Sequence, residues 1–307
     1  MKKLLIVLSA LTAFLTLSAC SSGKSSATSA SSGTRNFQTA NGTVKIPSAP
    51  KRVVVQNYPD EALALGVTVV GTDSWAYPNP YFSAAQKKNL VDLGAPSFNL
   101  PKLIAQKPDL IVATDKTQVA NYEKVAPTVL VDYSKFKNMK QSLDYFADLL
   151  NRKDAEKAFL DSFNKTAADE QKKLAAAGIA PADKTVSILE LQGDKIYAYG
   201  DNFARGGQAL TYGLGFKESA QMKKLSAGAG YAQVNAESLK DFDADYIFVD
   251  FASADSAQFA ALSENPAFKA LKGKIITMDY SKVYFFGGPI ASQKEMPIYT
   301  DAILAAK

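Results

Sequence analysis

Apolar side chains recur mostly at four-residue steps between residues 152 and 178, with Lys, Asp and Glu elsewhere and no proline. This pattern predicts one long helix, which Gly178 would end and Pro181 would keep from continuing. Some 26 residues at 1.5 Å each would span roughly 39 Å, too long for a helix packed inside one small α/β unit. We therefore predict that it joins two units. The apolar positions are Ala155, Phe159, Phe163, Ala167 and Leu174.

On both sides of this stretch, short β-branched runs alternate with helical patches. Such alternation predicts a mostly parallel sheet covered on both faces. The expected fold class is α/β: two α/β lobes, residues 36–151 and 179–307, joined by a single helix over 152–178, with a ligand cleft between them. The expected strands are 52–56, 67–71, 110–114, 128–133, 185–191, 195–199, 245–250 and 274–278. The expected helices are 59–65, 99–106, 117–125, 139–150, 206–214, 236–242, 256–262, 266–271 and 290–305.

A weak internal repeat supports two similarly built lobes. The segment that begins at Asn99 leads through Asp109 into an apolar strand, and the segment that begins at Asn235 leads through Asp245 into another. Asn, Leu and Asp recur at one common offset, although helix-then-strand units resemble one another and chance could produce the match.

Residues 1–20 read as a targeting segment rather than as part of the fold. A basic start and an apolar core over 4–17 lead to Leu17-Ser18-Ala19-Cys20, which resembles a bacterial lipoprotein signal with Cys20 as the lipidated residue. The alternative is an ordinary secretory cleavage site with an incidental cysteine. Residues 21–35, rich in serine, would form a flexible tether. Because Cys20 is the only cysteine, no internal disulfide is expected.

Composition narrows the chemistry. The formal charge is +5, but the lysines are dispersed without interleaved aromatics, so no nucleic-acid partner is expected. The chain has no histidine, which removes the usual general base and the commonest zinc ligand. We therefore expect no catalytic residue and no protein-bound metal, although the many carboxylates leave a glycosidase possible by inventory alone.

The loop over residues 74–82 is unusually aromatic. It carries Trp75, Tyr77, Tyr81 and Phe82, and loops rarely hold so many apolar rings unless they meet something. The rings could instead pack back onto the lobe. Trp75 is the best candidate for exposure.

A second aromatic segment, residues 197–207, is expected to line the cleft. It carries Tyr197, Tyr199, Phe203 and Arg205, and an arginine fork among aromatic faces suits a ligand with clustered oxygen acceptors and a sizeable apolar body. The alternative for Arg205 is a structural salt bridge to a nearby carboxylate such as Asp201. Beside two glycines, Tyr284 and Phe285 form another aromatic wall or belong to the core.

The lipoprotein signal, the tether, the two-lobe plan and the segments over 124–133 and 197–207 resemble the ferric-siderophore-binding lipoproteins of bacterial ABC importers, most closely the ferric hydroxamate binders. The resemblance covers about residues 36–307. It implies a monomer that captures a ferric hydroxamate, whose oxygens fill the iron's coordination shell, so that no cofactor is needed. It further implies that Tyr133, Tyr197 and Arg205 donate hydrogen bonds to the ligand and that Phe203 packs on it. Phe203 and Phe285 stand where relatives often have tryptophan.

The resemblance also implies partners: the permease subunits of the importer, and the membrane through a lipid anchor. Family members commonly dock through one glutamate on each lobe. Glu237 matches the second-lobe position, although it could merely complement its own helix dipole. The first-lobe position is Pro101, so either docking is asymmetric or a neighbour such as Glu61 or Asp92 substitutes. Other interpretations are a catecholate, haem or corrinoid binder, a surface carbohydrate hydrolase, or an adhesin without a deep cleft.

Overall fold

The computed structural model describes residues 33–203, 205–252, 255–279, 283 and 287–306. The described residues belong to one compact unit. The signal segment and Cys20 therefore lie outside the described residues. The tether predicted over 21–35 extends too far, because Thr34 and Arg35 already belong to a strand.

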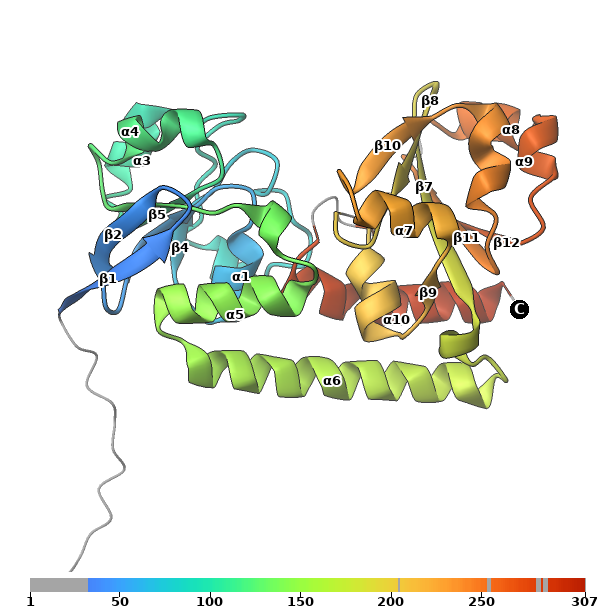
Figure 1. Cartoon of the computed structure of the whole chain (residues 1–307), viewed down its shortest axis with the longest axis horizontal. Helices are drawn as coiled ribbons and strands as arrows, with labels where there is room; N and C mark the ends of the chain where they lie inside the picture. Colours follow the sequence, from blue (N-terminus) through green and yellow to red (C-terminus); the bar gives the residue numbers. More distant parts are fainter. Residues whose placement is uncertain (1–32, 204, 253–254, 280–282, 284–286, 307) are drawn as a thin grey trace, which may run out of the picture. The chain divides into compact units, whose positions relative to one another are not determined.

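The N-terminal lobe is built on a parallel four-stranded sheet in the order β4-β3-β5-β6 (Figure 1). Every residue of these strands is buried, because alternate side chains enter two different cores. That burial explains why the strands read as continuous apolar runs. The strands are β3 (Val53–Val55), β4 (Val69–Gly71), β5 (Leu110–Ala113) and β6 (Thr128–Leu130). The helices are α1 (Pro59–Ala64), α2 (Ala84–Lys87), α3 (Leu100–Ala105), η1 (Lys116–Gln118), α4 (Val119–Tyr122), η2 (Tyr133–Lys135) and α5 (Met139–Leu150).

A hairpin precedes this sheet. Strands β1 (Thr34–Thr39) and β2 (Gly42–Pro47) pair antiparallel, and Phe37 and Ile46 anchor them in the N-terminal core. The sequence analysis did not predict these strands, because most of their residues are polar and at least partly exposed.

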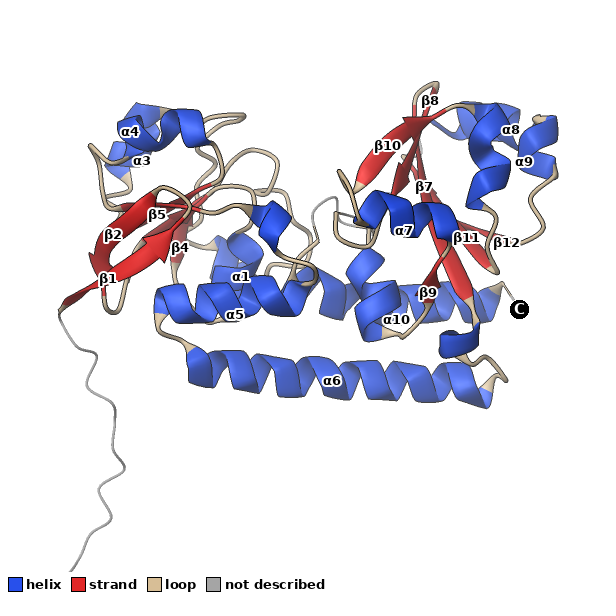
Figure 2. Cartoon of the chain, viewed as in Figure 1, coloured by secondary structure: helices blue, strands red, loops and turns tan. Residues whose placement is uncertain are grey.

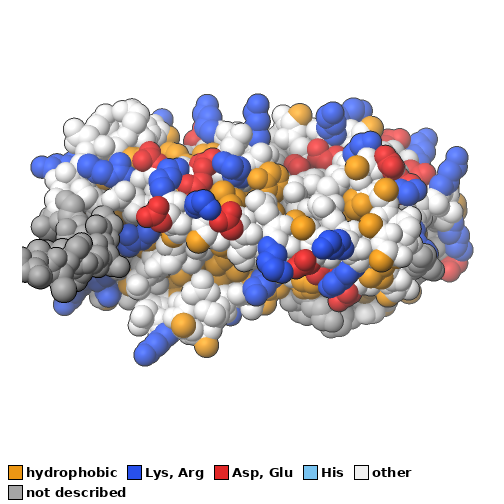
Figure 3. Space-filling model, turned by 90° about the horizontal axis from the view of Figure 1, so that it is seen from below, with side chains coloured by type: hydrophobic (Ala, Val, Ile, Leu, Met, Phe, Trp, Pro, Cys, Tyr) orange, Lys and Arg blue, Asp and Glu red, His pale blue; other side chains and the backbone are white. Residues whose placement is uncertain are grey.

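The long helix is present as predicted. Helix α6 (Lys153–Ala176) follows Asn151, which has left-handed backbone angles, and ends before Gly178, whose φ of +77° favours glycine. Its 24 residues correspond to about 36 Å. Phe159 and Leu160 pack against both the N-terminal and the C-terminal core. The opposite face carries acidic and basic side chains side by side (Figure 3), including the pairs Lys157–Asp161 and Lys165–Asp169.

The C-terminal lobe contains a mixed sheet in the order β10-β8-β7-β11-β12, with β9 beside β7. Helices flank the strands, as in the first lobe (Figure 2). Three of its five strand pairings are parallel, as the prediction of a mostly parallel sheet requires, and the exception is β8, which pairs antiparallel with both β7 and β10. The strands are β7 (Thr185–Gln192), β8 (Lys195–Tyr199), β9 (Lys217–Glu218), β10 (Tyr231–Val234), β11 (Tyr246–Phe251) and β12 (Lys274–Asp279). The helices are η3 (Pro181–Asp183), η4 (Ala209–Gly213), α7 (Ala220–Ser226), η5 (Ala236–Phe242), α8 (Ser256–Glu264), α9 (Pro266–Lys269) and α10 (Pro289–Ala305).

The two lobes are joined at more than one place, so the predicted single connection is incomplete. Helix α10 packs on α6 and begins against the N-terminal lobe. There the backbone N–H groups of Ile290 and Ala291 donate to the carboxylate of Asp60 in α1, at N···O distances of 2.6 and 3.3 Å. Asp60 thus caps the N-terminus of α10 from the other lobe, where a negative charge complements the helix dipole.

The internal repeat corresponds to equivalent structure. The side chains of Asn99 and Asn235 each accept from the backbone N–H three residues on, at the starts of α3 and η5. Asp109 accepts from the backbone N–H of Arg52 just before β3, and Asp245 accepts from that of Thr185 at the start of β7. The same polar contacts therefore position the first strand of each lobe.

Candidate functional site

A pocket lies between the lobes. One wall comes from the N-cap and first turn of α1, from η2 and from the start of α5, and the other comes from the segment after β8 and the approach to α10. Its cavity volume is about 60 Å³, far below the several hundred Å³ of a typical small-molecule site. A large cargo therefore requires the walls to separate. The lining residues are Tyr58, Glu61, Tyr133, Phe136, Asn138, Met139, Ser142, Asp201, Asn202, Phe203, Gln208, Gly287 and Gly288.

The N-terminal wall is built on two stacked phenols. The rings of Tyr58 and Tyr133 lie 3.4 Å apart between centroids at an interplanar angle of 20°, and Phe136 meets Tyr133 edge-on at 5.4 Å. The Tyr133 hydroxyl is buried and has no hydrogen-bond partner within the described part of the chain. Burial raises the pKa of Tyr133 well above its usual value, so the phenol keeps its proton and remains a donor.

Two adjacent carboxyls lie behind this wall. Burial, together with the neighbouring Asp60, raises the pKa of Glu61 to about 8. Burial raises the pKa of Asp60 to about 7, although the N–H groups of Ile290 and Ala291 act in the opposite direction. Glu61 is only 2% exposed, which corrects its predicted role as a permease-docking residue. The first turn of α1 resembles an exposed acidic helix start in sequence, but α5 and α10 cover it.

The C-terminal wall carries Phe203, as predicted from the sequence. Its ring lies 4.7 Å from that of Tyr231 and 6.0 Å from that of Tyr199. Gln208 joins the walls, because its side-chain oxygen accepts from the backbone N–H of Met139 at 3.0 Å. Sequence reasoning missed Gln208, since no local pattern marks a contact between segments so far apart in the chain.

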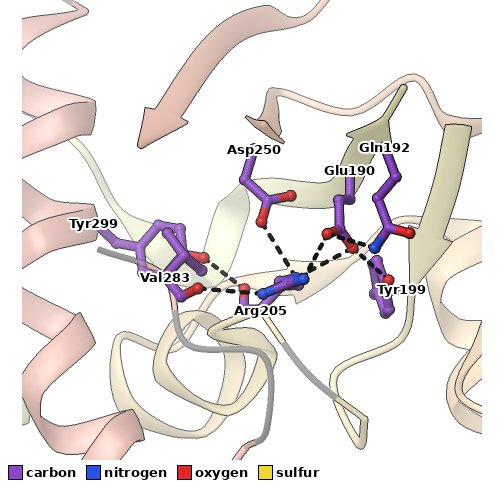
Figure 4. A network of polar contacts seen from close by, with 7 residues as sticks. All are labelled: Glu190, Gln192, Tyr199, Arg205, Asp250, Val283 and Tyr299. Carbon is purple, nitrogen blue, oxygen red and sulfur yellow. Dashed lines mark hydrogen bonds and ion pairs between the residues drawn. The ribbon is translucent and has the colours of Figure 1, made fainter. Parts of the chain in front are cut away.

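Arg205 does not line the pocket (Figure 4). Its guanidinium pairs with Glu190 at 2.5 Å and with Asp250 at 3.2 Å, and it also donates to the backbone oxygen of Val283 at 3.3 Å. The hydroxyl of Tyr199 donates to the same Glu190. Arg205 is 1% exposed, so a direct bond to a ligand would require the guanidinium to leave these carboxyls.

Arg205 therefore forms a structural salt bridge, which was the alternative to ligand binding. Its partners are Glu190 and Asp250 rather than Asp201. Glu190 and Asp250 lie inside buried strands, β7 and β11. A charged residue within a mostly apolar strand indicates a buried, paired charge, and this signal was present in the sequence at both positions. Burial raises the pKa of Asp250 to about 8, against the opposing effect of Arg205.

The remaining predicted ligand residues are dispersed. Tyr197 is half-buried in β8, Tyr199 is buried, and neither lines the pocket. Trp75 is 50% exposed, which confirms its predicted exposure, whereas Phe82 of the same loop packs into the N-terminal core. Tyr284 and Phe285 lie outside the described residues.

Among the predicted docking positions, Glu237 lies exposed in the first turn of η5. Pro101 and Lys102 are exposed at the equivalent place in α3. Asp92 is half-buried, and its carboxylate accepts from the Ser74 hydroxyl at 2.7 Å.

Within the described ranges, no helix is long and apolar enough to cross a membrane. The same part of the chain holds no group of three or more Asp, Glu, His or Cys residues placed to bind a metal ion.

Comparisons with known proteins agree with this architecture. Over 318 residues the chain is 33% identical to the iron(3+)-hydroxamate-binding protein YxeB of Bacillus subtilis, covering 99% of this chain and 98% of the relative. The solved FhuD protein from S. pseudintermedius superimposes with a TM-score of 0.74 at 26% identity, covering 89% of this chain and 98% of that one. FhuD2 from Staphylococcus aureus with bound ferrioxamine B superimposes with a TM-score of 0.69 at 27% identity, covering 84% and 99%. Residues 56–280 match the family model for periplasmic binding proteins, and the chain belongs to this family.

Proposed function

We propose that this protein is the substrate-binding lipoprotein of an ABC importer, and that it captures a ferric hydroxamate and delivers it to a membrane permease. The observation that carries the proposal is the pocket between the lobes, with the phenol of Tyr133 on one wall and the ring of Phe203 on the other. Two of the relatives named above are described as binding iron(3+) hydroxamate or with ferrioxamine B bound. The protein needs no metal ligand of its own, because the hydroxamate oxygens surround the iron.

The charge of the pocket selects among cargoes. Its described lining includes two acidic residues, Glu61 and Asp201, and neither lysine nor arginine. A strongly anionic catecholate complex would require clustered cations, whereas a ferric trishydroxamate core is electrically neutral. The lining therefore favours the hydroxamate over the catecholate.

Two carboxyls in one pocket also bear on the hydrolase alternative. Glycosidases use such a pair, one as acid and one as base or nucleophile. Here the Asp201 carboxylate accepts from the Thr211 hydroxyl of its own lobe at 2.9 Å, and the chain belongs to a family of binding proteins. We therefore propose binding without catalysis.

In this proposal each ligand residue has a distinct task. Tyr133 donates its free O–H to a hydroxamate or carbonyl oxygen, and Phe203 packs on the apolar arms of the chelate. Tyr199 and Arg205 hold the C-terminal wall through Glu190, and Tyr197 extends that wall. Tyr284 and Phe285 are also candidates because they stand three and two residues before the lining residue Gly287 in the sequence. Two helices, α6 and α10, connect the lobes, so we expect a small rotation of the lobes to separate the walls for the cargo and an equally small closure onto it.

The protein has a single tryptophan, which gives a direct assay. Titration with a ferric hydroxamate is expected to quench the fluorescence of Trp75 with a sub-micromolar midpoint. The ferric chelate absorbs the excitation energy of the tryptophan and does not itself fluoresce. The gallium-loaded siderophore is the matched control, since it should bind with similar heat but quench much less. Unchanged emission together with no heat for several ferric hydroxamates would show that this ligand class is wrong.

We expect Glu237→Ala to spare ligand binding and to lower uptake in cells, because the exposed carboxylate would pair with a cation of the permease. Asp241→Ala, at an exposed position near the end of the same element η5, is the control. Binding is measured by calorimetry and uptake with radioactive iron. Wild-type uptake by Glu237→Ala would remove this residue from the docking surface.

We propose further that Cys20 is lipidated and holds the folded unit at the outer face of the membrane. The signal resemblance and the serine-rich stretch after it support this anchor. Incorporation of a labelled fatty acid that requires Cys20 is the test, and labelling of Cys20→Ala would speak against it.

A further inference from the structure

The strongest unexplained feature of the pocket is a buried acid, Glu61, which has Ser142 as a hydrogen-bond partner but keeps one carboxyl oxygen unpaired within the described ranges. Glu61 lines the pocket, and its Oε2 atom has no hydrogen-bond partner among the described residues. An unsatisfied buried carboxyl oxygen costs free energy unless a ligand or water completes it. Its position at the pocket makes the cargo the natural candidate.

The surroundings of Glu61 contain acids and phenols but no cation. Asp60 is its neighbour on α1, and Tyr58 and Tyr133 interact with it electrostatically. Two other elements packed on α1 add further groups. Helix α10 contributes Glu295, which raises the pKa of Tyr81, and α5 contributes Tyr145, which raises the pKa of Tyr133. Asp73 contributes to the raised pKa of Tyr58.

The other elements packed on α1 contribute apolar side chains to the core beside it. Strands β3 and β4 consist of valine and glycine, and α6 presents Phe159 and Leu160 to this core. Asp60 already accepts two backbone N–H groups, which favour a negative charge there. A second charge beside it would be both buried and repelled, so Glu61 keeps its proton.

We propose that Glu61 binds the cargo as a neutral carboxylic acid that donates its O–H to an oxygen of the ferric chelate, beside the O–H of Tyr133. Two protonated donors on a wall whose described lining holds no cation would match an electrically neutral, oxygen-rich complex. They would reject a complex that needs cationic partners. The inference rests on the proposed function and deepens it by naming the charge class of the ligand.

The test is the pH dependence of binding, with ferrioxamine B, which carries a free ammonium group, and its N-acetylated derivative, which does not. Since the pKa of Glu61 is about 8, wild-type affinity for both ligands should fall about tenfold between pH 7 and pH 9, as the competent fraction falls. Glu61→Gln keeps an N–H donor and should bind within a few-fold of wild type at pH 7, without that dependence. Glu237→Gln is the control and should keep the wild-type profile.

Three results would overturn the inference: a flat wild-type profile, an unchanged pH loss in Glu61→Gln, or binding of ferrioxamine B that tightens with pH while that of the acetylated ligand does not. The last result would mean that an ionised Glu61 binds the ammonium group. No binding by the wild type at any pH would instead overturn the proposed function, and this inference with it. Circular dichroism of each variant confirms that it is folded.

Discussion

Replacement of Arg205 by leucine is expected to lower the free energy of unfolding by about 3–5 kcal/mol. The guanidinium is fully buried between Glu190 and Asp250, and its removal leaves Glu190 without its cation in a site that excludes water. Chemical denaturation followed by circular dichroism measures the change. A loss below about 1 kcal/mol would show that the network contributes little to the fold.

Asp250→Asn provides the matched control for this prediction. Because burial raises the pKa of Asp250 to about 8, this carboxyl is mostly neutral at pH 7, and the amide should cost far less than the loss of Arg205. If Asp250→Asn and Arg205→Leu lowered the free energy of unfolding by similar amounts, the buried ion pair could not be assigned to Arg205 and Glu190 alone. Ligand binding by Arg205→Leu is then measured under conditions in which the variant is folded. This measurement distinguishes an arginine that only supports the C-terminal wall from one that contacts the ligand directly.

The second large effect is expected in the pH dependence of stability. Glu61 has a folded-state pKa of about 8, above its ordinary value, so between these two values the native state holds a proton that the unfolded chain has lost. Stability is therefore greatest in mild acid and falls as pH rises, by about 1.4 kcal/mol per unit for this group, or about 4 kcal/mol from pH 5 to pH 8. Asp60, with a pKa of about 7, adds to the same slope up to neutrality.

Urea unfolding at each half unit of pH measures this slope. Glu61→Gln should remove roughly 1.4 kcal/mol per unit from it between pH 5 and pH 8. Asp92→Asn is the control, because hydrogen bonds and a nearby lysine hold the pKa of Asp92 below its usual value and it is already ionised in this range. A wild-type stability that rises from pH 5 to pH 8 would contradict the buried, neutral Glu61.

The long helix and most strands could be predicted because their signals are local. Helix α6 shows its periodicity within one stretch and ends at Gly178, and α5 and β8 begin and end where their apolar patterns do. Strand β1 was missed because polar, partly exposed residues dominate it, and β10 because it is short and none of its residues is buried. The asparagine caps of the internal repeat were visible because each bonds only three residues away.

The site was harder to predict because its contacts are not local. Arg205 was expected to face the ligand, but it is buried against Glu190 and Asp250. These two carboxyls lie on neighbouring strands, β7 and β11, that are far apart in the sequence. Asp60 meets α10 across 230 positions of the chain, and this contact helps to bury Glu61 beside it. Periodicity carries no information on such pairs. Tyr133 was identified through the family resemblance, whereas Phe203 was already marked by its place in the aromatic segment over residues 197–207.

The central claim is that the pocket between Tyr133 and Phe203 holds the iron complex. Crystals grown with an iron-loaded hydroxamate, measured on both sides of the iron absorption edge, locate the iron directly by anomalous scattering. We predict one strong peak between the two lobes, flanked by Tyr133 and Phe203. A peak elsewhere, such as the open groove of the C-terminal lobe lined by Lys195 and Asn265, would contradict this account.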